Sequence, residues 1–148
     1  MRVFGIGNRY RHDDAAGLVV AERVGGTPFE GEPVGRIEVW SGEDAVLLVD
    51  AVSSGAPPGT LHRLDAVAEP LPPALFAAST HHLGVADAVE LARALGRLPA
   101  KVVVIGIEGA CFDAGEGLSI EVETAVERAV EAVREEVGAC TSAPCCGT

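Results

Sequence analysis

Two aspartates and a histidine, Asp14, Asp50 and His81, are the residues of this sequence best suited to carry out chemistry. Two carboxylates and one imidazole form a mixed oxygen and nitrogen donor set, which binds borderline divalent ions such as nickel or zinc. The three residues lie too far apart in the sequence to form a local metal motif such as H-E-x-x-H. The fold therefore has to bring three separate loops together to make them one site.

The two aspartates are predicted to meet at one edge of a sheet. Asp14 lies in the first turn of a predicted helix, after the glycine-rich turn 5–8 (GIGN) that follows the first predicted strand. Asp50 directly follows the apolar run 45–49, where a buried carboxylate is costly without a partner. Because ligands bind outside the carboxyl ends of parallel strands, both aspartates are expected at that edge.

Simpler interpretations of the same residues stay open at this point. Asp13 fits the N-cap of the first helix, although this leaves Asp14 without a role. Asp50 fits a solvated aspartate that ends its strand. His81 stands beside His82, and the two side chains point in different directions, so at most one of them faces a given site.

The glycine-rich turn does not fit a dinucleotide site, and the charge of the chain does not fit nucleic acid. Tyr10 stands where the third glycine of the dinucleotide fingerprint is needed, and Asp13 and Asp14 would repel a phosphate. The formal net charge is -11 at pH 7. Nucleic-acid binding needs a basic face, so we expect no nucleic-acid partner.

The alternation of strands and helices predicts an α/β protein built as a three-layer α/β/α sandwich. Two strands are unbroken apolar runs, which are typical of parallel strands buried on both faces. Pro28 lacks a donor for a strand ladder, so its strand is placed at a sheet edge. The predicted strands cover residues 2–6, 27–30, 45–50, 60–64 and 101–107, and the predicted helices residues 13–24, 33–40, 83–95 and 119–137, the last capped by Ser119.

Length and composition predict one compact domain over residues 1–137. The chain has 148 residues, of which 48% are hydrophobic and only 4% aromatic, so small aliphatic side chains fill the core. No run reaches the roughly 18 to 20 apolar residues of a membrane span, and the sequence starts directly with a strand, so we expect no membrane contact and a cytoplasmic protein. Residues 138–148, with three cysteines, are expected to form a mobile tail. Glu108, after the last strand, is expected at the same edge as Asp50, in a salt bridge or at the surface.

Three segments taken together resemble the signature regions of the nickel–iron hydrogenase maturation proteases. They are residues 5–17 (GIGN and DDAAG), 49–60 (VDAV and PGT) and 79–84 (STHHLG), and they occur in the family's order. Residues 102–109 and 117–119 resemble the family's last strand and the start of its last helix. The resemblance covers the chain from residue 1 to about 137.

The resemblance implies a five-stranded, mostly parallel sheet between helices, of the phosphorylase/hydrolase-like type. It implies that Asp14, Asp50 and His81 are the metal-contacting and catalytic positions. The implied partner is the nickel-loaded large-subunit precursor of a nickel–iron hydrogenase, which carries the nickel itself, so no permanent cofactor is expected. The turn at Glu30, Gly31 and Glu32 matches the region linked to substrate recognition.

The implied activity is endoproteolytic removal of the precursor's C-terminal extension after nickel insertion. Nickel can polarise the carbonyl or a bound water, or one aspartate can act as general base, and the sequence does not choose between these. No serine or cysteine has a triad-like setting, which argues against a covalent mechanism. The alternative is a non-hydrolytic metal-binding or chaperone module. Its support is the short stretch before Glu30, which leaves the second strand truncated or absent.

Overall fold

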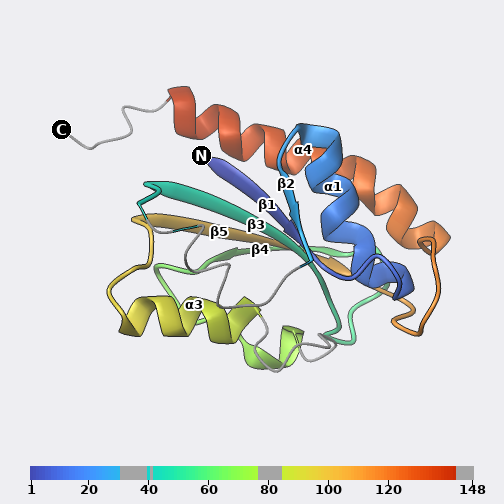
Figure 1. Cartoon of the computed structure of the whole chain (residues 1–148). Helices are drawn as coiled ribbons and strands as arrows, with labels where there is room; N and C mark the ends of the chain where they lie inside the picture. The colour runs from blue at the N-terminus through green and yellow to red at the C-terminus, as the bar shows by residue number, and fades with distance from the viewer. Residues whose placement is uncertain (31–39, 41, 77–84, 143–148) are drawn as a thin grey trace.

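The computed structural model describes residues 1–30, 40, 42–76 and 85–142, which form one sheet with helices on both sides (Figure 1). Five strands and three α-helices alternate along the described chain, together with two short 3-10 helices. In chain order the elements are β1 (Arg2–Ile6), η1 (His12–Ala15), α1 (Ala16–Val24), β2 (Thr27–Phe29), β3 (Ala45–Val52), β4 (Leu61–Asp65), η2 (Pro73–Phe76), α3 (Val85–Ala94), β5 (Lys101–Glu108) and α4 (Ile120–Ser142).

The sheet has five strands in the order β2-β1-β3-β5-β4. Strands β2, β1, β3 and β5 pair in parallel, and β4 runs antiparallel to β5. This confirms the expected five-stranded, mostly parallel sheet. The second strand is present but only three residues long, and it lies at the edge, where Pro28 loses no hydrogen bond to an outer neighbour.

Helices α1 and α4 cover one face of the sheet and α3 covers the other, so the predicted three-layer sandwich is confirmed (Figure 1). The central strand β3 shows why its sequence is apolar without alternation. Leu47 and Val49 pack on the α1 and α4 side, whereas Val46 and Leu48 pack on the α3 side with the fully buried Trp40. Each face of a strand in this position meets a hydrophobic layer.

Several element boundaries differ from those expected by one or more residues, and three of the differences are discussed here. The first helix does not begin at residue 13, because residues 12–15 form the tighter turn η1 and α1 begins at Ala16. Strand β3 continues past Asp50 to Val52, held there by its pairing with β5. Helix α4 runs to Ser142, so its expected end at residue 137 is too early. The predicted boundary between domain and tail stays a prediction, and the predicted helix over 33–40 lies outside the described residues except for Trp40.

Helix α4 is amphipathic along its length. The stripe expected to face the sheet is buried, and the opposite face carries charged side chains. None of the helices in the described ranges combines the length and the apolar character needed to cross a bilayer. The buried stripe consists of Val122, Val126, Ala129, Val130 and Val133.

An ion pair ties the antiparallel edge strand β4 to α4. The Arg63 guanidinium donates hydrogen bonds to the Glu136 carboxylate, whose side chain is 16% exposed. The hydrogen bond from Arg63 lowers the pKa of Glu136 below its usual range. Arg63 itself is 53% exposed, so solvent weakens the interaction.

We expect Glu136→Gln to lower the free energy of unfolding by about 0.5 kcal/mol near neutral pH, the usual size for an exposed pair. Because the folded-state pKa lies below the unfolded one, this contribution is present above the unfolded pKa and is lost as pH falls through the folded value. Urea unfolding of wild type and variant from about pH 7 down to about pH 3 measures the difference. The exposed neighbour Glu135, changed to Gln, is the control. A difference that stays constant over this range would contradict the interpretation.

Candidate active site

Asp14 is brought to the carboxyl edge of the sheet by close contact between main chains. A Cβ atom on Gly17 would overlap the carbonyl oxygen of Val49 and lie 2.6 Å from that of Ile6. A Cβ on Gly7 would overlap the carbonyl oxygen of Asp14 itself. The glycines around the first turn therefore let η1 and the start of α1 lie directly against the ends of β1 and β3. These glycines therefore allow close packing between main chains, which is a different role from binding the phosphates of a nucleotide.

Asp50 lies inside β3, not after it. It pairs with Gly106 of β5, and its side chain is only 4% exposed. Its Oδ1 accepts a hydrogen bond from the amide of Ala51 at 2.9 Å. The interpretation of Asp50 as a solvated strand end is therefore wrong, because the strand continues and the carboxylate is buried.

The structure brings the segments of the two aspartates together. Turn η1, which carries Asp14, contacts β3, which carries Asp50, and Asp14 is 5% exposed. Two buried carboxylates on contacting elements at the carboxyl ends of parallel strands have the placement of a ligand site.

His81 lies outside the described residues, so its place relative to the aspartates stays a prediction. The described chain on either side of it is anchored on the α3 face of the sheet. The carbonyl of Leu75 accepts a hydrogen bond from Ser53, directly after β3, at 2.9 Å, and Val85 is fully buried. Within the described ranges, no group of three or more His, Cys, Asp or Glu side chains is arranged to hold a metal ion. A nickel or zinc ion at Asp14 and Asp50 would therefore need a further ligand from elsewhere.

Asp13 lies in the turn of the candidate site, and its structural role was not revealed by the sequence. It is fully buried, and its carboxylate accepts hydrogen bonds from the amides of Ala110 (2.7 Å), Cys111 (3.0 Å) and Ser119 (2.8 Å) and from the Ser119 hydroxyl (2.9 Å). Its own amide donates to the carbonyl of Cys111. Asp13 therefore does not cap its own helix. The hydroxyl of Ser119, which was expected to cap α4, donates a hydrogen bond to Asp13. Instead, Asp13 ties the loop before α4 to the turn that carries Asp14.

The same loop holds His12 in a strained conformation. His12 is the only non-glycine residue of the described chain with a positive φ, at 42°. Its Nδ1 donates to the carbonyl of Gly117 at 3.0 Å, and its amide donates to that of Gly115 at 2.9 Å. Such outliers persist only where surrounding contacts hold them, which is typical of functional sites. No local spacing signals this contact, since its partners lie about a hundred residues apart in the chain.

Glu30, one of the three residues expected to recognise substrate, follows β2 at the same sheet edge. Its carboxylate accepts a hydrogen bond from the amide of Arg9 at 3.2 Å and forms an ion pair with the Arg9 guanidinium. Arg9 also donates to Glu22 at 2.8 Å, and this hydrogen bond raises the pKa of Arg9. Gly31 and Glu32 lie outside the described residues. Glu30 is thus an acidic side chain near η1 that is already paired with Arg9.

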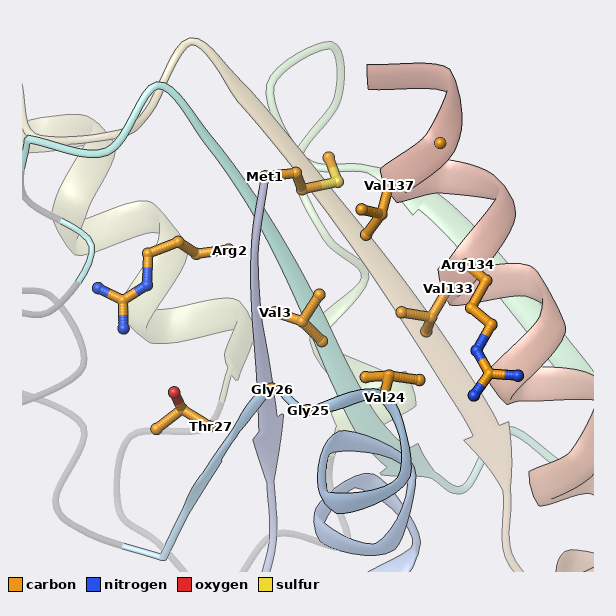
Figure 2. Close-up of a pocket in the computed structure, with 11 residues that line it drawn as sticks. Met1, Arg2, Val3, Val24, Gly25, Gly26, Thr27, Val133, Arg134 and Val137 are labelled. Atoms are coloured by element: carbon orange, nitrogen blue, oxygen red, sulfur yellow. The ribbon is translucent and has the colours of Figure 1, made fainter. Parts of the chain in front are cut away.

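A cavity of about 530 Å³ lies at the opposite edge of the sheet (Figure 2). It is formed by the start of β1, the end of α1 with the following glycines, and the last turns of α4. Because it lies at the amino ends of β1 and β2, it is separate from Asp14 and Asp50 and is not the candidate active site. Its apolar lining includes Val3, Val24, Val133 and Val137.

Comparison with known proteins yields one family and a set of similar structures. A family model described as hydrogenase maturation protease matches residues 31–136. A search of curated proteins finds no match to the sequence. Among solved structures, the chain resembles the hydrogenase maturating endopeptidase HybD from E. coli, with 27% identity and a TM-score of 0.77 over 93% of this chain and 92% of that one. It also resembles the [NiFe] hydrogenase maturation protease HybD from Thermococcus kodakarensis, with 28% identity and a TM-score of 0.68 over 92% and 99%.

The contacts of Asp13 predict that Asp13→Asn destabilises the protein although the side chain keeps its shape. An amide places a donor against main-chain and hydroxyl donors, and leaving such buried groups unsatisfied costs about 1–3 kcal/mol. Urea unfolding measures the loss, and Asp113→Asn, an exposed change in the same loop, is the control. Equal stability of Asp13→Asn and wild type would show that the carboxylate does not hold this loop.

The contacts of Gly17 predict that Gly17→Ala is destabilising. Alanine normally stabilises a helix interior by about 1 kcal/mol relative to glycine. Here the added Cβ meets main-chain oxygens that cannot move aside, so overpacking of about 1–3 kcal/mol outweighs that gain. Gly138→Ala is the matched control, because it lies in α4 with no atom within 4 Å of the added carbon. A stabilising Gly17→Ala in thermal melts would refute the close-approach argument.

Proposed function

The chain belongs to the hydrogenase maturation protease family, and we propose that it removes the C-terminal extension of a nickel–iron hydrogenase large-subunit precursor after nickel insertion. Family membership makes the protein a peptidase, and the similar solved structures are named as maturation endopeptidases. The observation that carries the proposal is the pair of buried carboxylates, Asp14 and Asp50, on contacting elements at the carboxyl edge of the sheet.

In this proposal the substrate carries the nickel that the site recognises. Two carboxylates in a largely water-excluded edge attract a divalent ion more strongly than exposed carboxylates do, because charge interactions grow as the local dielectric falls. An imidazole added to them would make a donor set suited to nickel, and His81 is proposed as its source. Asp14, Asp50 and His81 would thereby hold the metal-bearing end of the precursor and place the scissile peptide bond beside it. The protein needs no metal of its own in this scheme.

Hydrolysis then requires an activated water. The nickel of the substrate can polarise the scissile carbonyl or lower the pKa of bound water, which contributes several kcal/mol in metal hydrolases. A carboxylate of Asp14 or Asp50 not occupied by the metal can instead take the proton of the attacking water, a contribution of about 10² to 10⁴ in rate. In both cases the water adds to the carbonyl carbon, and the C–N bond breaks as the leaving amine receives a proton.

Recognition of the precursor is proposed to involve the turn after β2. Glu30 lies at the same edge as Asp14, and Arg9 already holds its carboxylate. Gly31 and Glu32, which follow it, are included in this proposal on the basis of the family resemblance.

We expect the purified protein to cleave nickel-loaded precursor and to leave nickel-free precursor intact, as measured by mass spectrometry of the product. Asp14→Asn, Asp50→Asn and His81→Ala are each expected to lower the rate by at least about 10²-fold, the size typical of catalytic acid–base or metal-contacting groups. Normal processing by His81→Ala would remove that residue from the site.

The control for these variants is Glu135→Gln, on the exposed face of α4. Binding of loaded precursor without cleavage would favour the non-hydrolytic metal-binding or chaperone alternative. Cleavage of nickel-free peptides at a comparable rate would instead point to a broader peptidase.

A further inference from the structure

A buried carboxylate that the proposed mechanism does not use lies two residues beyond the β5 partner of Asp50. Glu108, at the end of β5, is 2% exposed. It accepts hydrogen bonds from the amide of Ser54 at 2.9 Å, from the hydroxyl of Ser54, and from His62 Nε2 at 3.2 Å. His62 is a partner that forms the expected salt bridge only when its ring is protonated, whereas the expectation of a surface position was wrong. Burial of an ionised carboxylate is tolerated here because three donors converge on it.

The strand register places His62 in the same row as Asp50. Asp50 of β3 and His62 of β4 both pair with Gly106 of β5, one from each side. Side chains on one row of a sheet point to one face, and neighbours of these residues along the strands, such as Val104, pack on the α3 face. Two strand spacings separate the Cα atoms of Asp50 and His62, which amounts to about 10 Å.

The middle position of this row carries no side chain. A Cβ on Gly106 would lie 2.9 Å from Val52 and 3.5 Å from the Cβ of His62. Glycine therefore leaves room for the side chain of Val52, from the next row of β3, to lie over this position. His62 and Asp50 are the two polar side chains of this row, one on each side of Gly106.

The contact with Glu108 orients the His62 ring. Because a carboxylate only accepts, Nε2 carries the proton and donates it to Glu108. The other ring nitrogen, Nδ1, has no hydrogen-bond partner among the described residues, and the side chain is 23% exposed. A histidine whose one nitrogen donates to a buried carboxylate presents its other nitrogen as an acceptor in a fixed direction.

We propose that His62, oriented by Glu108, is a further substrate-binding residue of the active site, where Nδ1 accepts a hydrogen bond from a main-chain N–H of the precursor. This inference rests on the proposed function and deepens it, because it extends the site from β3 across β5 to β4. Glu108 is a positioning residue in this scheme. It acts on the substrate through His62, and it also fixes the loop after β3, since its main chain bonds Gly59 and Thr60 at 2.8 Å.

The test is the steady-state kinetics of nickel-loaded precursor cleavage by His62→Ala, Glu108→Gln and the double variant. Loss of one hydrogen bond is expected to raise KM about two- to tenfold, with kcat nearly unchanged. The isosteric Glu108→Gln turns its amide donor toward the donors it faces, so it disturbs the orientation of His62. The double variant is expected to be no worse than the worse single variant, because both remove the same interaction.

Arg63→Gln is the matched control, since Arg63 neighbours His62 in β4 but points to the other face and pairs with Glu136. Its KM is expected to equal that of wild type. Nitrogen NMR shifts of the His62 ring add a readout that needs no substrate: the Nε2-protonated form is expected in wild type and is lost in Glu108→Gln. If His62→Ala fails to fold, His62→Gln, whose amide can still donate to Glu108, carries the same kinetic test.

The outcomes separate this inference from the proposed function. Wild-type protein that neither binds nor cleaves the loaded precursor defeats the proposed function, and the inference with it. Wild-type cleavage combined with an unchanged KM in folded His62→Ala overturns the inference alone. Additive effects in the double variant would likewise overturn it, because they would show that Glu108 does not act through His62.

Discussion

The candidate site depends on main-chain contact between the first helix and the sheet. Gly17 lies against the carbonyl oxygens of Val49 and Ile6, so close that no side chain fits between them. This contact sets the distance of η1 from β3, and hence the position of Asp14 relative to Asp50. The glycines of the first segment thus act through geometry and not through flexibility.

Around this contact, the described chain buries four acidic side chains, Asp13, Asp14, Asp50 and Glu108. All four belong to η1 or to the last residues of β3 and β5, at one edge of the sheet. Asp13 and Glu108 are saturated by main-chain, hydroxyl and imidazole donors and serve to fix loops. Buried charge is costly, so its concentration at one edge of an otherwise apolar core is the placement expected of a functional edge.

Much of the fold was predictable because the strands and helices have recognisable patterns in their local sequence. The apolar run at the centre of the chain predicted a buried parallel strand, and Pro28 predicted an edge. The positions of Asp14 and Asp50 at one edge followed from the rule for parallel sheets. The contacts of Asp13 with Ser119 and of His62 with Glu108 could not be predicted, because they join residues 106 and 46 positions apart and no local pattern encodes them. The extension of β3 past Asp50 was missed for the same reason, since pairing with β5 and not composition determines where the strand ends.

The bonds from Asp13 to the loop before α4 also bear on when the protein becomes competent. That loop follows the turn it holds by about a hundred residues, so it leaves the ribosome later. A chain released before residue 110 contains Asp14 and Asp50, but it lacks the main-chain amides that donate hydrogen bonds to Asp13. Long-range closure of this kind is slow compared with local helix formation. Assembly of this turn is therefore expected to follow formation of the local helices, and a chain without residues 110–119 would lack the donors that hold it.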